Sequence, residues 1–175
     1  MPRRTLVTGF LPFGGFQVNP SALLAESCGR PFELIEVAYA AADEFLDRLG
    51  DADESFDRLV MLGLRGNGTT IDLERLARNH IGEVPDVRGV VRGPAPVEPG
   101  APDTLFTTLA APAPIPTVSF SSDPGCYLCN YVYYRALRRF PGKRVGFVHV
   151  PPLEVLPPQV QQAVLAGLLD ALEAS

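Results

Sequence analysis

Residues 5–29 read TLVTGFLPFGGFQVNPSALLAESCG. They contain, in order, a short apolar and β-branched run, a glycine-rich loop and the start of a helix. The apolar run predicts a buried strand that ends at Gly9. Asn19 followed by Pro20 is typical of a helix N-cap and the first helical residue, and Gly29 is expected to end that helix. The stretch therefore predicts one strand–loop–helix unit.

The same alternation of strands and helices continues along the rest of the chain. Further strands are expected at 32–39, 58–62, 70–78, 115–121 and 144–150, and further helices at 41–49, 104–109, 127–140 and 160–172. This alternation predicts a layered α/β fold with a mostly parallel sheet. Turn-forming residues dominate 80–99, which predicts a surface loop. Because no internal repeat or linker is found, residues 1–175 are expected to form a single domain.

Composition and charge exclude several classes of protein. The chain has 175 residues, 46% of them hydrophobic, and a net charge of −5. Its arginines form no basic stripe, so nucleic acid is not an expected partner. It has no uncharged run near 18 residues, so no membrane-spanning helix is expected. The apolar run near the N-terminus is shorter than the roughly 7–15 residues of a secretory signal, which predicts a cytoplasmic location. Three cysteines without such a signal argue against a disulfide scaffold.

Four segments that follow or end predicted strands are expected to lie close together. They are Gly9–Phe16, Gly63–Thr69, Ser121–Cys129 and His149–Pro152. In open α/β sheets, ligands bind at the carboxyl ends of the strands. The four segments therefore predict a site at one edge of the sheet.

Cys129 lies between a predicted strand and a predicted helix. A thiol at a helix N-terminus is favoured as the thiolate, because the unpaired N–H groups and the helix dipole stabilise the negative charge. The alternative interpretation is a buried cysteine that packs as a small hydrophobic residue. Position alone does not separate the two interpretations.

A nucleophilic thiol requires a base and a group that orients that base. His149 ends a strongly apolar strand and is the candidate base, whereas His80 lies in the turn-rich region and is expected to be solvated. Glu74, on the mixed face of its strand, is the candidate orienting carboxylate. The alternatives are a structural histidine and a surface salt bridge from Glu74 to Arg75 or Arg78.

Three weaker patterns indicate other kinds of site. The spacing Cys126-x-x-Cys129 matches a thioredoxin-type redox pair, but the usual context of that motif is missing. The two cysteines with His80 and His149 are unlike the usual spacing of zinc ligands. The glycine-rich loops at 9–15 and 66–70 lack the lysine of a P-loop and the G-x-G-x-x-G spacing of a dinucleotide site.

Four motifs together resemble a known family of cysteine peptidases, pyroglutamyl peptidase I, also called pyrrolidone carboxyl peptidase. The motifs are GFLPFGGFQVNPS (9–21), IDLERLARN (71–79), PGCYLCNYVYY (124–134) and VGFVHVP (145–151). They occur in the order that the family has them and cover the chain from end to end. The resemblance implies a three-layer α/β/α sandwich with a mostly parallel mixed sheet, no metal or other cofactor, a cytoplasmic location and a homo-oligomer, either a dimer or a tetramer.

The resemblance also implies an activity and the residues that perform it. It implies removal of the N-terminal pyroglutamyl group from peptides through a thioester acyl-enzyme, with Cys129 as nucleophile, His149 as general base and acid, and Glu74 as orienting carboxylate. The substrate is a small, neutral, flat lactam, which suits a pocket of aromatic faces and a few hydrogen bonds. The residues expected to bind it are Phe10, Phe13, Phe16, Asn19, Leu64 and Tyr127. The alternative for the aromatic residues is ordinary packing in the core.

The chain also departs from the family pattern. The region between Asn79 and Ser119 is short, and the loop at 63–68 reads GLRGNG without the usual Gly-Arg ending. The arginine that commonly follows the glutamate strand has no clear counterpart, with Arg78 and Arg88 as candidates. The alternative function is therefore a catalytically altered homologue, acting as a binding protein or as a hydrolase of another small acyl or lactam group.

Overall fold

The computed structural model describes residues 4–15, 17–52, 56–109 and 115–174. The strands of the main sheet are β1 (Thr5–Phe10), β2 (Phe32–Ile35), β3 (Arg58–Leu64), β4 (Ile71–Glu74), β7 (Val118–Ser121) and β8 (Arg144–Val150). The helices are α1 (Pro20–Ser27), α2 (Tyr39–Asp51), α3 (Leu128–Arg139) and α4 (Pro158–Ala174), and a second, two-stranded sheet contains β5 (Leu76–Arg78) and β6 (Thr104–Phe106). Within these described residues, no helix is both long and apolar enough to cross a membrane.

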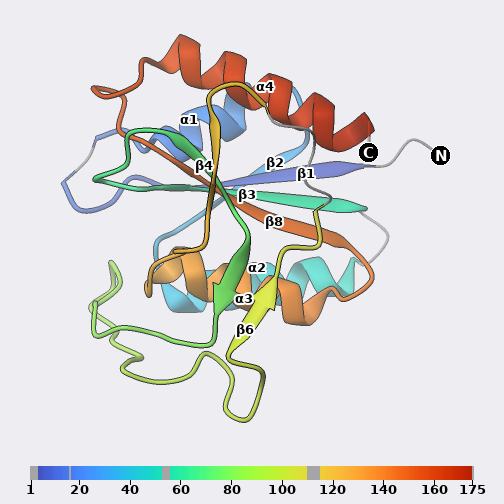
Figure 1. Cartoon of the computed structure of the whole chain (residues 1–175). Coiled ribbons are helices and arrows are strands. Elements are labelled where there is room, and N and C mark those ends of the chain that lie inside the picture. The colour runs from blue at the N-terminus through green and yellow to red at the C-terminus, as the bar shows by residue number, and fades with distance from the viewer. Residues whose placement is uncertain (1–3, 16, 53–55, 110–114, 175) are drawn as a thin grey trace.

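The main sheet has six strands in the order β2-β1-β3-β8-β4-β7. The strands β2, β1, β3 and β8 are parallel, β4 is antiparallel to β8, and β7 is parallel to β4. Helices α1 and α4 cover one face of the sheet, and α2 and α3 cover the other (Figure 1). This arrangement confirms the predicted three-layer sandwich with a mostly parallel mixed sheet.

The two faces of the sheet bury two separate apolar clusters. One cluster joins the sheet to α2 and α3 and is rich in aromatic side chains, among them Phe45, Tyr131, Tyr133 and Phe147. The other joins the sheet to α1 and α4 through aliphatic side chains. Strands covered on both faces require apolar residues in both directions, which explains why β1 and β3 are nearly continuous apolar runs. The core thus holds the carboxyl ends of these strands in a fixed register.

The prediction of a helix at 104–109 is wrong. Residues Thr104–Phe106 form β6, which pairs antiparallel with β5, and the N–H of Thr107 donates a hydrogen bond to the Arg75 carbonyl at 2.9 Å. The segment is rich in β-branched and aromatic residues, which favour a strand once a partner strand is available. The strand predicted at 70–78 is divided at Arg75 into β4 and β5.

Asn130 joins the first turn of α3 to the segment that follows β5. Its side chain is fully buried. The amide oxygen accepts from the Arg78 N–H at 2.8 Å, and the amide nitrogen donates to the carbonyls of Arg78 at 2.8 Å and His80 at 2.9 Å. These bonds fix the start of α3 against residues 78–80 of the same chain.

We expect Asn130→Ala to lower the free energy of unfolding by about 1–3 kcal/mol, because it removes three hydrogen bonds from partly buried backbone groups. Urea unfolding followed by circular dichroism measures this change. A loss within experimental error of zero would show that the three bonds do not stabilise this junction.

Candidate active site

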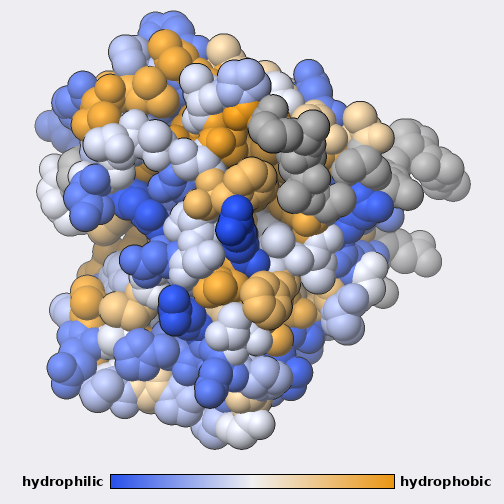
Figure 2. Space-filling model, in the orientation of Figure 1, coloured by the Kyte–Doolittle hydropathy of each residue, from blue (hydrophilic) through white to orange (hydrophobic). Residues whose placement is uncertain are grey.

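The loops that follow β1 and β3 lie at one edge of the sheet, at the left in Figure 1. In Figure 2 the surface is hollowed at this edge, between those loops and the arm that contains residues 79–103. A cavity of about 480 Å³ opens here, and its lining includes residues 67–70, residues 123–127, Leu64, Arg65, Asp72, Cys129 and His149. The predicted site therefore lies at the carboxyl edge of the parallel strands.

The register of the sheet brings His149 and Glu74 together. His149 is paired with Gly63 of β3 on one side and with Asp72 of β4 on the other. Directly paired residues point to the same face, and so do residues two apart along a strand. Glu74 therefore projects beside the His149 ring, and its Oε1 lies 2.7 Å from His149 Nδ1. Both side chains are buried.

The hydrogen bond to Glu74 sets the tautomer of His149. A carboxylate only accepts hydrogen bonds, so His149 Nδ1 carries the hydrogen and donates it to Glu74. In the neutral ring, Nε2 is then the nitrogen with a free lone pair. An imidazole held in this way is able to accept a proton at Nε2.

Cys129 occupies the second position of α3, whose N-cap residue Tyr127 makes no side-chain capping bond. Its sulfur lies over Gly63: a Cβ atom added to this glycine would be 2.7 Å from the Cys129 Sγ and 2.7 Å from Phe147. The absence of a side chain at Gly63 therefore leaves the space that the sulfur fills. Gly63 is also the residue paired with His149, so the thiol and the imidazole share one face of the sheet.

Burial raises the pKa of the Cys129 thiol to about 12, with the nearby Arg65 lowering it and Glu74 raising it further. Removal from water disfavours the charged thiolate more than the positive neighbour favours it. The thiol is therefore neutral at pH 7. Its reaction as a nucleophile requires that a base take the proton as the sulfur attacks.

Arg65 is the charged residue at the site that sequence reasoning missed. Its Nη2 donates to Glu74 Oε1 at 2.7 Å and its Nη1 to Asp72 Oδ2 at 3.3 Å. The sequence signal was present in the GLRGNG loop after β3, but a single arginine there has no recognisable spacing. Of the two arginines considered instead, Arg78 donates to the Ser122 carbonyl and Arg88 pairs with Glu36.

A small apolar slot adjoins the cavity and shares Cys129 with it. The slot has a volume of about 40 Å³ and is lined by Phe10, Phe13, Asn19, Val37, Leu64, Tyr127, Leu128 and Cys129. Five of the six residues expected to bind substrate therefore line one space. The sixth, Phe16, lies outside the described residues. The Tyr127 hydroxyl donates to the Pro85 carbonyl at 3.0 Å, which holds its ring at the wall.

Asn19 holds the loop that follows β1 against α1. Its Oδ1 accepts from the N–H and the hydroxyl of Ser21, and its Nδ2 donates to the Leu11 carbonyl at 3.2 Å. The Ser21 hydroxyl in turn accepts from the Phe10 N–H at 3.0 Å. Asn19 therefore both caps the helix, as predicted, and sets the position of Phe10 in the slot.

Two of the weaker patterns, the redox pair and the zinc site, have no support in the geometry of the described residues. Cys28, Cys126 and Cys129 are free thiols. His80 is exposed, as expected, and lies outside the lining of the cavity. In the part of the chain that the structure describes, no group of three or more His, Cys, Asp or Glu side chains has the arrangement of a metal site.

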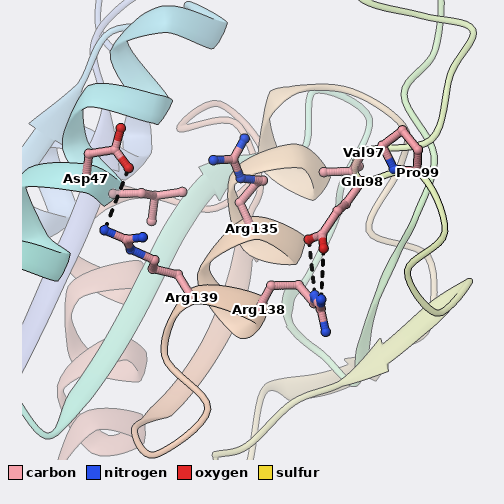
Figure 3. A pocket seen from close by; sticks show the side chains of 8 residues that line it. Asp47, Val97, Glu98, Pro99, Arg135, Arg138 and Arg139 are labelled. Carbon is pink, nitrogen blue, oxygen red and sulfur yellow. Dashed lines mark hydrogen bonds and ion pairs between the residues drawn. The ribbon is translucent and has the colours of Figure 1, made fainter.

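A second cavity lies away from these residues, between α2, α3 and the segment 97–99. Its volume is about 450 Å³. Figure 3 shows Arg138 paired with Glu98 and Arg139 paired with Asp47 at its walls. Because the charges of its walls are paired and its described lining contains no buried nucleophile or base, this cavity is not the candidate active site.

An α/β/α sandwich with a thiol, an imidazole and a carboxylate at the carboxyl edge of its strands has the arrangement typical of a cysteine hydrolase. The family model for pyroglutamyl peptidase matches residues 3–168. The chain belongs to this family.

Individual relatives agree with this assignment. The pyrrolidone-carboxylate peptidase of Pyrococcus furiosus is 32% identical over 85% of this chain and 80% of its own length. The pyrrolidone-carboxylate peptidase of Streptomyces coelicolor is 33% identical over 98% of this chain and 91% of its own length.

Solved structures show the same fold. A mutant pyrrolidone carboxyl peptidase from Pyrococcus furiosus superposes with a TM-score of 0.84 at 27% identity, covering 98% of this chain and 99% of that one. Pyroglutamyl peptidase I from Bacillus amyloliquefaciens superposes with a TM-score of 0.85 at 23% identity, covering 99% of this chain and 98% of that one.

The raised pKa of Cys129 leads to a spectroscopic prediction. Because the neutral form of an acid predominates below its pKa, we expect little thiolate at Cys129 between pH 7 and pH 9, and an increase toward about pH 12. The measurement is the ultraviolet thiolate absorbance of the chain minus that of Cys129→Ser, recorded across the pH range in which the fold persists. A full thiolate signal from Cys129 at pH 7 would show that burial does not control the pKa of this thiol.

Proposed function

We propose that this chain removes N-terminal pyroglutamyl groups from peptides as a cysteine peptidase, with Cys129, His149 and Glu74 as catalytic residues. The observation that carries the proposal is the 2.7 Å bond between His149 and a fully buried Glu74, with His149 and Cys129 both lining one cavity. Family membership over residues 3–168 supports the choice of substrate.

In the first half of the reaction, Cys129 Sγ attacks the carbonyl carbon of the pyroglutamyl residue and its proton passes to His149 Nε2. Collapse of the tetrahedral intermediate breaks the peptide bond, and the departing amine takes that proton. The product is a thioester between Cys129 and the pyroglutamyl group. The N–H groups in the first turn of α3 are available to stabilise the oxyanion, because they have no partner within the helix.

In the second half, water attacks the thioester and gives a proton to His149. The carbon–sulfur bond breaks, pyroglutamate leaves, and the proton returns to the Cys129 sulfur. Glu74 accepts the hydrogen bond from His149 Nδ1 throughout and stabilises the imidazolium that forms in each half.

The substrate-binding proposal follows from the chemistry of the slot. Pyroglutamate has no charge on its ring and presents two flat faces, which suit walls formed by Phe10, Phe13 and Tyr127. Because the slot has a volume of only about 40 Å³, these side chains would move apart as the ring enters. Leu64, Tyr127 and Cys129 line both the slot and the larger cavity, so the two spaces meet at the thiol. The peptide after the scissile bond would then extend from Cys129 into the larger cavity.

We expect turnover of a pyroglutamyl-coumarin substrate to fall by a factor of at least about 10³ in Cys129→Ser, because the members of such a triad act as a unit. Cys28→Ser is the matched control, since Cys28 bonds to the Ala25 carbonyl at the end of α1. A prolyl-coumarin substrate, which lacks the ring carbonyl, should be cleaved much more slowly.

Fluorescence release under reducing conditions provides the readout. Full activity in Cys129→Ser would exclude this thiol as the nucleophile. If the unaltered chain does not cleave the pyroglutamyl substrate even when reduced, the catalytically altered homologue becomes the better description.

We also propose that residues 1–175 act as one domain, that the chain is cytoplasmic and that it forms a homo-oligomer. The shared sheet, built from strands of both halves of the chain, supports the first of these, and the family resemblance supports the other two. Multi-angle light scattering on the purified chain should give a mass of two or four copies of 18.9 kDa, and a monomer at micromolar concentration would contradict the oligomer.

A further inference from the structure

The Arg65 side chain lies across the wall of the catalytic cavity. Its backbone is held by the end of β8, since the Arg65 N–H donates to the Val150 carbonyl at 2.9 Å. The side chain is 24% exposed, and its guanidinium contacts Asp72 and Glu74 on β4 as well as the Asp123 carbonyl in the turn before α3. One cation therefore touches two of the segments that carry catalytic groups.

The second feature is a carboxylate that requires a positive partner. Glu74 is fully buried, and its Oε2 has no hydrogen-bond partner among the described residues. Its Oε1 accepts from both His149 Nδ1 and Arg65 Nη2, each at 2.7 Å. A buried carboxylate without a counter-charge is strongly destabilising. Apart from Arg65, the described partner of Glu74 that is able to supply a positive charge is the His149 ring, which would do so by taking up a proton.

A protonated resting ring would block the proposed chemistry. The imidazolium has hydrogens on both nitrogens, so its Nε2 cannot accept the proton of the Cys129 thiol. Arg65 Nη2 lies 3.2 Å from His149 Nδ1. Because Nδ1 donates to Glu74, this short approach is between two donors and disfavours a further positive charge on the ring.

We propose that Arg65 is a positioning residue whose guanidinium compensates the buried Glu74 carboxylate, so that His149 rests as the neutral ring that accepts the Cys129 proton. The effect of Arg65 on catalysis rests on the function proposed above. Its effect on the charge of His149 does not depend on any substrate. Arg65 also favours the developing thiolate, since its charge acts to lower the pKa of Cys129.

The charged and titratable groups around His149 come from each neighbouring element. They are Asp72 and Glu74 on β4, Arg65 in the loop after β3, and Cys129 on α3. Asp72 is itself occupied by Thr70 and Arg65. Of these groups, Arg65 is the permanent cation, so its removal leaves two carboxylates facing the ring and should extend protonation of His149 to higher pH.

The experiment measures the protonation of both histidines by NMR in chain labelled with ¹⁵N-histidine. In Arg65→Met we expect the midpoint for His149 to rise by about one pH unit or more, the usual effect of losing a nearby like charge. Arg65→Lys, which keeps the charge, should return the midpoint most of the way. The exposed His80 ring serves as the internal control. Arg88→Met is the matched variant, because it removes an arginine whose ion pair with Glu36 lies outside the cavity.

Kinetics with the pyroglutamyl-coumarin substrate add a second readout. At a pH below the midpoint, we expect kcat in Arg65→Met to fall about tenfold for each pH unit by which the midpoint rises, because the fraction of neutral His149 falls by that factor. The acid limb of the pH profile should move to higher pH together with the NMR midpoint.

A purely structural role for Arg65 would lower activity without raising the His149 midpoint, and that result would overturn the proposal. An unchanged or lowered midpoint in a folded Arg65→Met chain would do the same. If the midpoint rises as expected but the unaltered chain cleaves no pyroglutamyl substrate, the account of Arg65 stands and the proposed function is wrong.

Discussion

The antiparallel pairing of β4 with β8 is the constraint on which the rest of the site depends. It sets Asp72 opposite His149 and thereby places Glu74 beside the imidazole on the face that α3 covers. A slip of one residue in this pairing would turn Glu74 to the other face of the sheet. The apolar clusters on both faces of the sheet hold this register. The packing of the core therefore also sets the geometry of the site.

Much of this arrangement was predictable from local sequence. Alternating apolar runs and helix signals such as Asn19-Pro20 predicted the layers of the fold, and four motifs led to Cys129, His149 and Glu74. Contacts between segments that are distant in the sequence could not be predicted from local sequence. Arg65 reaches Glu74 across the site, and β6 is a strand because β5 is there to pair with it. Such contacts have no periodicity to recognise.

The site divides into an apolar part and a charged part, and the two need different physical support. The slot beside Phe10 and Phe13 has mostly apolar walls, and Asn19 holds its loop through hydrogen bonds to α1 and Leu11. The charged part buries Glu74 completely, which is tolerable only with partners of opposite charge or with donors. Cys129 lies where the two parts meet, over the space left by Gly63.

A crystal structure of the chain after reaction with the aldehyde analogue of pyroglutamate is the most direct test. Addition of the Cys129 thiol to the aldehyde would form a thiohemiacetal. The account predicts a bond from Cys129 Sγ to the aldehyde carbon, the lactam between Phe10 and Phe13, and His149 still bonded through Nδ1 to Glu74 with Nε2 facing the adduct. An adduct on another residue, or a His149 ring turned away from Glu74, would contradict it.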